Sequence, residues 1–459
     1  MVLPVLLGTV NPIHSVMIKS YTLGSIFLFL TCFGAITMGH SQTLYFPPAT
    51  GNIWDTVSPQ SLGWCTQYID STYDFLDRTD TKAFIVLKDG KIVLEKYFGT
   101  FARDSVWYWA SAGKTLTGLA VGLAQQDGRL NINQRTSDFL NPSWTSAPLV
   151  KENLITIRHQ LTMTSGLDDN VPDRDCTLPS CLQYLADVGS RWAYHNGPYT
   201  LLDEVVRSAT GSTNLTLYLL NRLRPTTGFA GAFIRSGYNN VFYSTPRNMA
   251  RFGLLMLNKG TWANTPILTD TAFFRQSTTT SQPINQAYGY LWWLNGKSSY
   301  RVPLSQLQFN GSLIPNGPSD IYAAIGKNGQ LINISPSERL VMIRMGVNSG
   351  SGLVPFSYND QIWQRLRRAI CTTTTLNTNT ESHQDRPSIW PNPSGGQFEI
   401  QIPKDLLIGS SWAVVNILGQ TICTGQTTGV TTLELDLSTR AKGSYILKIG
   451  ATTSRLVVQ

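Results

Sequence analysis

Two runs of apolar, β-forming residues stand close together early in the chain, at residues 83–87 and 92–98. The polar segment Lys88-Asp89-Gly90-Lys91 separates them. An Asp-Gly pair between two such runs favours a tight turn, because both positions tolerate a positive φ. The pattern therefore predicts a β-hairpin near the start of the fold.

Downstream of the hairpin the apolar residues change to a helical period. They fall at Leu116, Leu119, Ala120, Leu123 and Ala124. This spacing predicts a helix that ends at Gly128. Three glycines in or beside it, Gly113, Gly118 and Gly122, each cost about 1 kcal/mol relative to Ala. Packing must therefore hold this helix, and we expect it to be central.

The remaining pattern of the main part of the chain sets the fold class. A second helix is predicted from its cap at Thr156 to Ser165-Gly166. Strand-like runs at 322–325, 330–334 and 340–345 precede a terminal helix at 360–370. A hairpin first and a helix last predict an α+β fold, an antiparallel sheet closed by terminal elements with an all-helical region inserted.

Residues 372–388 lack apolar periodicity and are rich in Thr, Asn and Ser, which is typical of a linker. We therefore divide the chain into a main domain at 42–371, this linker, and a small module at 389–459. Turn residues in the module separate strand-like runs at 398–402, 412–417, 433–437, 445–449 and 455–458. Such short strands predict a small all-β sandwich.

Residues 1–41 have the order of a secretory signal. Lys19 precedes the apolar stretch 23–36, and Gly39-His40-Ser41 places small residues before a cleavage site at Gln42. Met17 is an alternative start. A lipoprotein interpretation would use Cys32, but Thr31 stands where a smaller residue is expected. No later apolar segment is long enough to span a membrane, so we expect an exported chain without a membrane span.

Composition narrows the function classes. Hydrophobic residues make up 42%, which excludes a disordered chain. The net charge is +8, but the Lys and Arg residues form no long basic run, so a nucleic-acid partner is not expected.

Five cysteines remain after signal removal, at 65, 176, 181, 371 and 423. A disulfide would close the short loop between Cys176 and Cys181, and Cys65 with Cys371 would join the two ends of the main domain. The alternative is that they are buried thiols. There is no Cys-x-x-Cys and the mature chain has three histidines, so neither a metal site nor another cofactor is expected.

Histidine-based serine catalysis also fits poorly. The chain has no Gly-x-Ser-x-Gly motif, and His159, beside Arg158, sits in a predicted helix where a structural role is favoured. Ser111-Ala-Gly-Lys114 offers another base, because the two side chains lie one turn apart at the start of the central helix. A buried lysine is pushed toward its neutral form, which accepts a serine proton. Alone, this spacing also fits a helix cap followed by a solvated lysine.

Two further motifs follow Ser111 in order. The first is Tyr194-His195-Asn196, and the second is Lys327-Asn328-Gly329. With these motifs, their separations and residues 157–167, the region 60–371 resembles the serine β-lactamase and penicillin-binding-protein superfamily. It is most similar to the class C β-lactamase-like group that also contains carboxylesterases, D-aminopeptidases and 6-aminohexanoate-dimer hydrolases.

The resemblance implies roles for individual residues. Ser111 would be the nucleophile of an acyl-enzyme, and Lys114 and Tyr194 would activate it and relay protons. Tyr194 acts as a base only if nearby cations favour its phenolate. Asn196 would orient Lys114 or a substrate amide. His195 is expected to be a spectator that turns away from the site.

The third motif implies the rest of the site. Lys327 and Gly329 belong to it, and the backbone N–H groups of Ser111 and Gln330 would stabilise an oxyanion. The motif departs from the Lys-Thr-Gly usual in β-lactamases and transpeptidases, which weakens the case for a β-lactam ligand. The flanking sequence through Pro336 resembles the esterase-type members.

Nine aromatic residues near these motifs would either line an apolar acyl pocket or, for most of them, belong to the core. They are Trp107, Tyr108, Trp109, Trp192, Tyr199, Tyr288, Tyr290, Trp292 and Trp293. Substrate choice would lie in loops such as 168–190 and 296–320.

The small C-terminal module resembles the type A sorting domain of the type IX secretion system of Bacteroidetes. The matching segments are the opening at 391–396, and 415–420, 435–438 and 442–448. The resemblance implies that the secretion machinery is a partner and that the protein crosses the outer membrane to the surface or medium. From the residues alone, a carbohydrate- or partner-binding sandwich is equally open.

The sequence thus predicts a secreted, carboxylesterase-like serine hydrolase that acts on an ester or amide. D-amino-acid peptidase, β-lactamase and 6-aminohexanoate-type amidase activities remain open. The rival class is a non-catalytic, penicillin-binding-like surface protein, although decay of a site usually strikes the nucleophile or base, and Ser111, Lys114 and Tyr194 are all present.

Overall fold

The computed structural model describes residues 43–347, 354–371, 387–402, 406, 408–416, 420–450 and 452–459. The predicted signal peptide at 1–41 and residues 372–386 of the predicted linker lie outside this set. The chain divides into two compact units between residues 372 and 373. No described helix has the length and apolar character needed to cross a bilayer.

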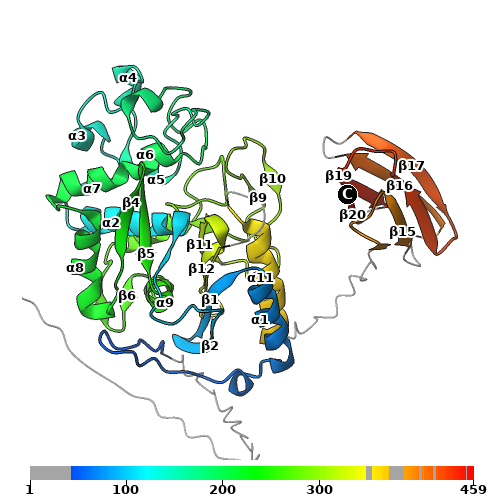
Figure 1. Ribbon diagram of the computed structural model, residues 1–459. Coiled ribbons are helices and arrows are strands. Elements are labelled where there is room, and N and C mark those ends of the chain that lie inside the picture. The colour runs from blue at the N-terminus through cyan, green and yellow to red at the C-terminus, as the bar shows by residue number, and fades with distance from the viewer. Residues whose placement is uncertain are drawn as a thin grey trace, which may run out of the picture. The chain divides into compact units, whose positions relative to one another are not determined.

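A six-stranded antiparallel sheet in the order β2-β1-β13-β12-β11-β8 forms the centre of the first unit (Figure 1). The predicted hairpin is β1 (Thr81–Lys88) and β2 (Lys91–Tyr97), and its turn residues Asp89 and Gly90 both have positive φ. The three later predicted strands are also present. They are β11 (Tyr322–Gly326), β12 (Gln330–Ser335) and β13 (Leu340–Gly346), and β8 (Trp293–Leu294) completes the sheet.

Helices cover both faces of this sheet. Neighbouring residues of β12 point to opposite faces, so each contacts a different helix. Ile332 meets α9 (Pro246–Leu257), where a Cβ on Gly253 would lie 3.2 Å from its side chain. Asn333 bonds Asn359 at 3.0 Å on α11 (Phe356–Ile370), the predicted terminal helix, which packs beside α1 (Ile69–Arg78). Every residue of β12 is buried as a result. The disulfide Cys65–Cys371 joins the segments next to these two terminal helices, with the Cα atoms 5.4 Å apart.

The central helix is α2 (Lys114–Gln126), and residues 114–124 are all buried. Its glycines permit this packing: a Cβ on Gly122 would lie 2.4 Å from the ring of Phe273 on α10 (Thr271–Ser277). Several helices surround α2 or extend the inserted region. They are α3 (Ser137–Leu140), α4 (Leu149–Glu152), α5 (Ile157–Leu161), α6 (Asn196–Thr200), α7 (Leu202–Thr210) and α8 (Leu215–Thr227).

Two details differ from the sequence pattern. The helix capped by Thr156 ends at Leu161 instead of continuing to Gly166, because Met163 has a left-handed φ of 59°. The inserted region also contains a three-stranded sheet, β3 (Trp107–Tyr108), β4 (Ala232–Ser236) and β5 (Asn239–Ser244). Short two-residue strands, β6 and β7 (Thr261–Trp262, Thr265–Pro266) and β9 and β10 (Ser299–Tyr300, Phe309–Asn310), pair locally.

The second unit is built from two antiparallel sheets around an apolar core that includes Ile400, Val414, Leu447 and Leu456. One sheet contains β14 (Ser388–Trp390), β15 (Gln397–Gln401) and β18 (Thr432–Asp436). The other contains β16 (Ile408–Asn416), β17 (Thr421–Thr428), β19 (Gly443–Ile449) and β20 (Thr452–Val458). The sandwich is as predicted, with β14 and β17 in addition.

Candidate active site

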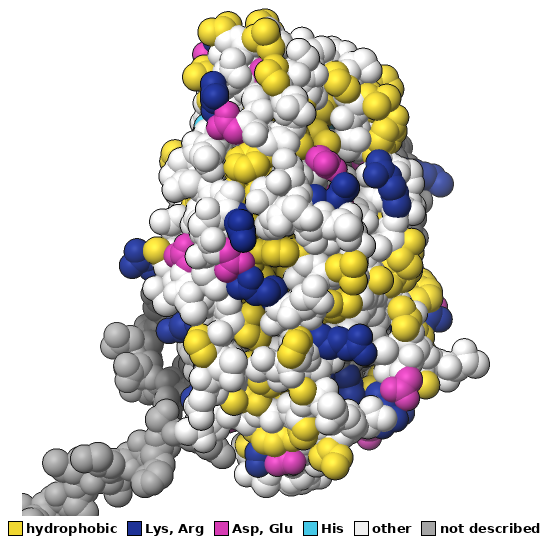
Figure 2. Space-filling view, turned by 90° about the vertical axis from the view of Figure 1, so that its left-hand side faces the viewer, with side chains coloured by type: hydrophobic (Ala, Val, Ile, Leu, Met, Phe, Trp, Pro, Cys, Tyr) yellow, Lys and Arg dark blue, Asp and Glu magenta, His cyan; other side chains and the backbone are white. Residues whose placement is uncertain are grey.

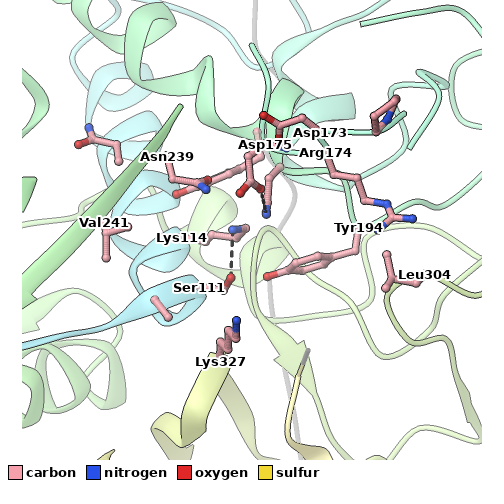
Figure 3. A pocket seen from close by; sticks show the side chains of 15 residues that line it. Ser111, Lys114, Asp173, Arg174, Asp175, Tyr194, Asn239, Val241, Leu304 and Lys327 are labelled. Atoms are coloured by element: carbon pink, nitrogen blue, oxygen red, sulfur yellow. Dashed lines mark hydrogen bonds between the residues drawn. The ribbon is translucent and has the colours of Figure 1, made fainter. Parts of the chain in front are cut away.

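Ser111 and Lys114 meet where a short 3-10 turn, residues 110–113, leads into α2. Lys114 Nζ lies 3.2 Å from Ser111 Oγ, as the dashed line in Figure 3 shows. Lys114 is 4% exposed, whereas Ser111 is partly open to solvent. The turn thus presents the serine at a surface and keeps the amine behind it.

Aromatic rings surround the Lys114 amine. Its Nζ lies 4.1 Å from the ring centre of Tyr199 and 5.3 Å from that of Tyr194. Burial lowers the pKa of Lys114 to about 7, and the charge of Asp175 opposes this shift. At neutral pH a large share of this lysine is therefore a neutral amine that can accept a proton.

Tyr194 points its hydroxyl toward Ser111 and its ring stacks on Trp293, with the centroids 5.7 Å apart (Figure 3). Burial raises the pKa of Tyr194 well above its ordinary value, although the contact with Ser111 opposes this rise. The structure therefore favours a protonated Tyr194 hydroxyl over a phenolate.

Asn196 begins α6, just after Tyr194 in the chain. Its side-chain amide donates a hydrogen bond to Asp175, 2.7 Å from Nδ2 to Oδ1. Its own Oδ1 is buried and finds no partner among the described residues. Asn196 thus meets Asp175, a residue that the motif analysis did not single out.

Lys327 reaches the site because β11 ends against the turn that carries Ser111. A Cβ on Gly326 would lie 2.4 Å from the backbone oxygen of Trp109 and 3.0 Å from the nitrogen of Ala112. This close approach brings Lys327 to Ser111 from the side opposite Lys114 (Figure 3). Two amines therefore flank one hydroxyl.

The second position of the third motif has a structural reason to be asparagine. Asn328 has a left-handed φ of 62°, which asparagine tolerates and a β-branched threonine does not. Its amide donates to the Tyr108 hydroxyl at 2.7 Å. The buried guanidinium of Arg344 donates to the carbonyl oxygens of Asn328 and Gly329, at 2.6 and 3.1 Å. The turn is thus fixed from both sides.

Gly329 and Gln330 complete the turn but do not line the cavity. Gln330 is fully buried, and its side chain forms two hydrogen bonds with the backbone of Gly346. Its backbone N–H, and that of Ser111, remain predicted oxyanion donors.

These residues surround a cavity of about 380 Å³. Besides Ser111, Lys114, Tyr194, Asn196, Tyr199 and Lys327, its walls are Ala110, Pro172, Asp173, Arg174, Asp175, Asn239, Asn240, Val241 and Leu304. Both loops expected to govern substrate choice contribute, through residues 172–175 and Leu304. The wall residues Asn239, Asn240 and Val241 of β5 were not expected from the sequence, because that strand carries no chemical motif.

The surface view in Figure 2 shows basic side chains scattered among white and apolar ones, several of them beside acidic side chains, with no extended basic face on the side it shows. This agrees with the absence of a long basic run in the sequence.

Most of the other residues singled out from the sequence lie outside the cavity walls. Of the nine aromatic residues considered for the pocket, Tyr199 lines the cavity, and the other eight lie outside its walls. His195 is 2% exposed and does not line the cavity, and burial lowers its pKa to about 4. His159 accepts from the backbone of Thr156 at 3.1 Å and so caps α5.

The Cys176–Cys181 disulfide is present, with a Cα separation of 5.9 Å, and Cys423 is a free thiol. Among the described residues, no group of three His, Cys, Asp or Glu side chains could hold a metal ion.

The fold and the cavity are those of the β-lactamase architecture. The chain belongs to the β-lactamase family, whose sequence profile matches residues 77–346. A second profile, for a secretion system C-terminal sorting domain, matches residues 388–459. That domain marks proteins exported by the type IX system to the cell surface or extracellular space.

Comparisons with individual proteins agree with this family, although the sequence identities are low. Protein flp of Staphylococcus aureus (strain NCTC 8325 / PS 47) is 27% identical over 180 residues, 34% of this chain and 36% of that protein. The match therefore spans about a third of the relative's length. A putative 6-aminohexanoate-dimer hydrolase from Bacillus anthracis has a TM-score of 0.53 at 17% identity, over 70% of this chain and 89% of that one. A putative β-lactamase from Bacteroides dorei DSM 17855 gives 0.53 at 16% identity, over 67% and 99%.

Proposed function

We propose that this protein is a serine hydrolase of the class C β-lactamase-like group that cleaves carboxylic esters or amides, carboxylesterase-like, through an acyl-enzyme. The observation that carries the proposal is the Ser111–Lys114 pair, 3.2 Å apart at the edge of a cavity that Tyr194 also lines. The sorting domain, which directs export, lies in the other unit of the chain. We therefore expect the substrate to be hydrolysed outside the cell.

The first half of the reaction transfers the acyl group. Neutral Lys114 accepts the proton of Ser111 while Oγ forms a bond to the substrate carbonyl carbon. The backbone N–H groups of Ser111 and Gln330 stabilise the negative oxygen of the tetrahedral intermediate. When the intermediate collapses, the leaving alcohol or amine takes a proton from Tyr194, which regains one from protonated Lys114. The serine ester remains.

The second half reverses these roles. Water gives a proton through Tyr194 toward Lys114 and attacks the ester carbon, and Ser111 regains its proton as the carboxylic acid leaves. Burial lowers the pKa of Lys114 and raises that of Tyr194. The amine is therefore the group that stores the proton, and the phenol is the relay.

The cavity walls support the proposed substrate class. Val241 and Leu304 give the cavity an apolar part that suits an acyl chain, while Lys327 offers a cation to an acidic group beside the scissile bond. Lys327 thus favours a second candidate, a peptidase or penicillin-recognising enzyme whose substrate bears a carboxylate.

The test is intact-mass spectrometry of the secreted protein after exposure to a fluorophosphonate and, separately, to a penicillin. A single adduct that is lost in Ser111→Ala supports the serine hydrolase. Ser105→Ala, a serine outside the cavity, is the matched control and should label like the parent. A stable penicillin adduct would support the second candidate, and labelling by neither probe would contradict both in favour of a non-catalytic binding protein.

Tyr194→Phe separates the relay from the base. Loss of general acid–base assistance is expected to slow acylation by about 10²–10⁴-fold. An unchanged rate would remove Tyr194 from the mechanism and leave Ser111 and Lys114 in it.

A further inference from the structure

The segment that carries Asp175 is tied down next to the cavity. Asp175 stands between Arg174, another wall residue, and Cys176, which is bonded to Cys181. The Arg174 side chain donates to the carbonyl oxygen of Asp169 at 2.7 Å. The disulfide on one side and this hydrogen bond on the other restrict where the intervening carboxylate can lie.

The same segment packs on the turn of the tyrosine motif. The backbone N–H of Gly197 donates to the carbonyl oxygen of Arg174 at 3.0 Å. A Cβ on Gly197 would lie 2.5 Å from the carbonyl oxygen of Cys176. The residue after Asn196 must therefore be glycine for the disulfide segment to approach this closely.

Asp175 meets two site residues at once. Its Oδ1 accepts from Asn196 Nδ2 at 2.7 Å, and its charge acts on the Lys114 amine. The groups that face Lys114 come from four places: Ser111 on the 3-10 turn, the rings of Tyr194 and Tyr199, and Asp175 on the disulfide segment. Lys327, Asp173 and Arg174 line the same cavity.

We propose that Asp175, held by the Cys176–Cys181 disulfide, is a positioning residue that fixes the Asn196 side chain and adds a negative charge to the surroundings of the Lys114 amine. The inference rests on the proposed roles of Ser111 and Lys114 as nucleophile and base.

The hydrogen bond to Asp175 decides how the Asn196 amide is oriented. Because Nδ2 donates to the carboxylate, Oδ1 becomes the free end of the amide, and it is buried without a partner among the described residues. A buried acceptor without a partner is costly and gains from a donor. An N–H group of a bound substrate would supply that donor, so Asp175 favours substrates with an amide next to the scissile bond.

The charge of Asp175 has a separate consequence. Burial lowers the pKa of Lys114 and Asp175 raises it, so removing the carboxylate should lower that pKa further. Because the neutral amine is the base, the acid limb of the reaction should then move to lower pH.

The experiment measures the rate constant of fluorophosphonate labelling of Ser111 against pH in the full-length secreted protein. The parent should show an acid limb near pH 7. Asp175→Asn keeps an acceptor for Asn196 and should move the limb down by about 1 pH unit. Asp175→Ala should show the same shift and a plateau about tenfold lower, because Asn196 is released as well. The matched control is Asp168→Asn, which makes the same charge change in the same loop away from the cavity and should leave the limb in place.

The role of the disulfide is tested by two double variants. Cys176→Ser/Cys181→Ser should shift the limb as Asp175→Asn does, whereas Cys65→Ser/Cys371→Ser should lower stability without moving the limb. If the parent is labelled but the acid limb does not shift in either Asp175 variant, this inference is overturned and the proposed function is not. A parent that is unlabelled at every pH would overturn the proposed function, and the inference with it.

Discussion

Gly326 lies so close to Trp109 that an added Cβ would come within 2.4 Å of the Trp109 carbonyl oxygen. Gly326 is the last residue of β11, and Trp109 directly precedes the 3-10 turn that carries Ser111. The two residues are far apart in the sequence. Their contact sets the distance between Lys327 and Ser111. Two motifs of the proposed active site therefore depend on one backbone contact.

Gly326→Ala should accordingly damage the site more than the fold. The backbone must separate by about 1 Å, and such overpacking costs about 1–3 kcal/mol. We expect Ser111 labelling by a fluorophosphonate to fall by about 100-fold or more, since misplacement of this size is that costly to catalysis. Labelling rates and urea unfolding check both expectations. Gly395→Ala, where nothing lies within 4 Å, is the control. Parental labelling in Gly326→Ala would contradict the dependence.

Lys114 should give the protein a pH-dependent stability. Its pKa falls from 10.5 to about 7 on folding. Between these values the unfolded chain binds more protons than the folded one, so stability rises with pH across this window. The contribution is up to about 1.4 kcal/mol per pH unit. Lys114→Met should remove that slope between about pH 7.5 and 9.5, raise stability at the lower end of this window and abolish labelling. Urea unfolding at several pH values checks this, with the exposed Lys259→Met as control. An unchanged slope would mean that Lys114 is charged in the folded state.

Two glycines of α2 should respond to alanine in opposite directions. At Gly118 the nearest atom to a new Cβ is 3.5 Å away, an ordinary contact, so helix propensity should add about 0.5–1 kcal/mol. At Gly122 the new Cβ would meet the buried Phe273 ring at 2.4 Å, and a loss of about 1–3 kcal/mol is expected. Thermal unfolding of the pair decides between packing and propensity, because propensity alone would stabilise both variants.

The two disulfides should differ in their effect on stability. Chain entropy depends on the length of chain enclosed, and the sequence separation is 306 for Cys65–Cys371 and 5 for Cys176–Cys181. Replacing the long-range pair by serine should cost about 6 kcal/mol, and the short one about 2 kcal/mol. Denaturant unfolding of the two double variants measures the difference. Equal losses would indicate that native contacts rather than chain entropy dominate.

The sequence predicted elements whose cause is local. Asp89-Gly90 specified the hairpin turn, and the period around Leu116 specified α2. β17 was missed because Thr421–Thr428 has no regular apolar alternation, which an edge strand does not need. The motif residues Ser111, Lys114, Tyr194 and Lys327 carry recognisable chemistry in recognisable order, and they do line one cavity.

The part of the site that sequence could not supply depends on contacts between distant segments. Asp175 looks like any polar loop residue until the fold brings it to Asn196. Asn240 of β5 has no motif around it, yet it reaches the cavity and also bonds Asp203 at 2.8 Å. Asn328 departs from the usual threonine for a reason visible only in its φ of 62°.

The Cys65–Cys371 bond closes residues 65–371 of the first unit into a covalent ring. A single proteolytic cut between them leaves one molecule instead of two fragments, which is useful where proteases are abundant. The C-terminal unit is attached just outside the point of closure. A cut in the chain after residue 371 would therefore leave this ring closed.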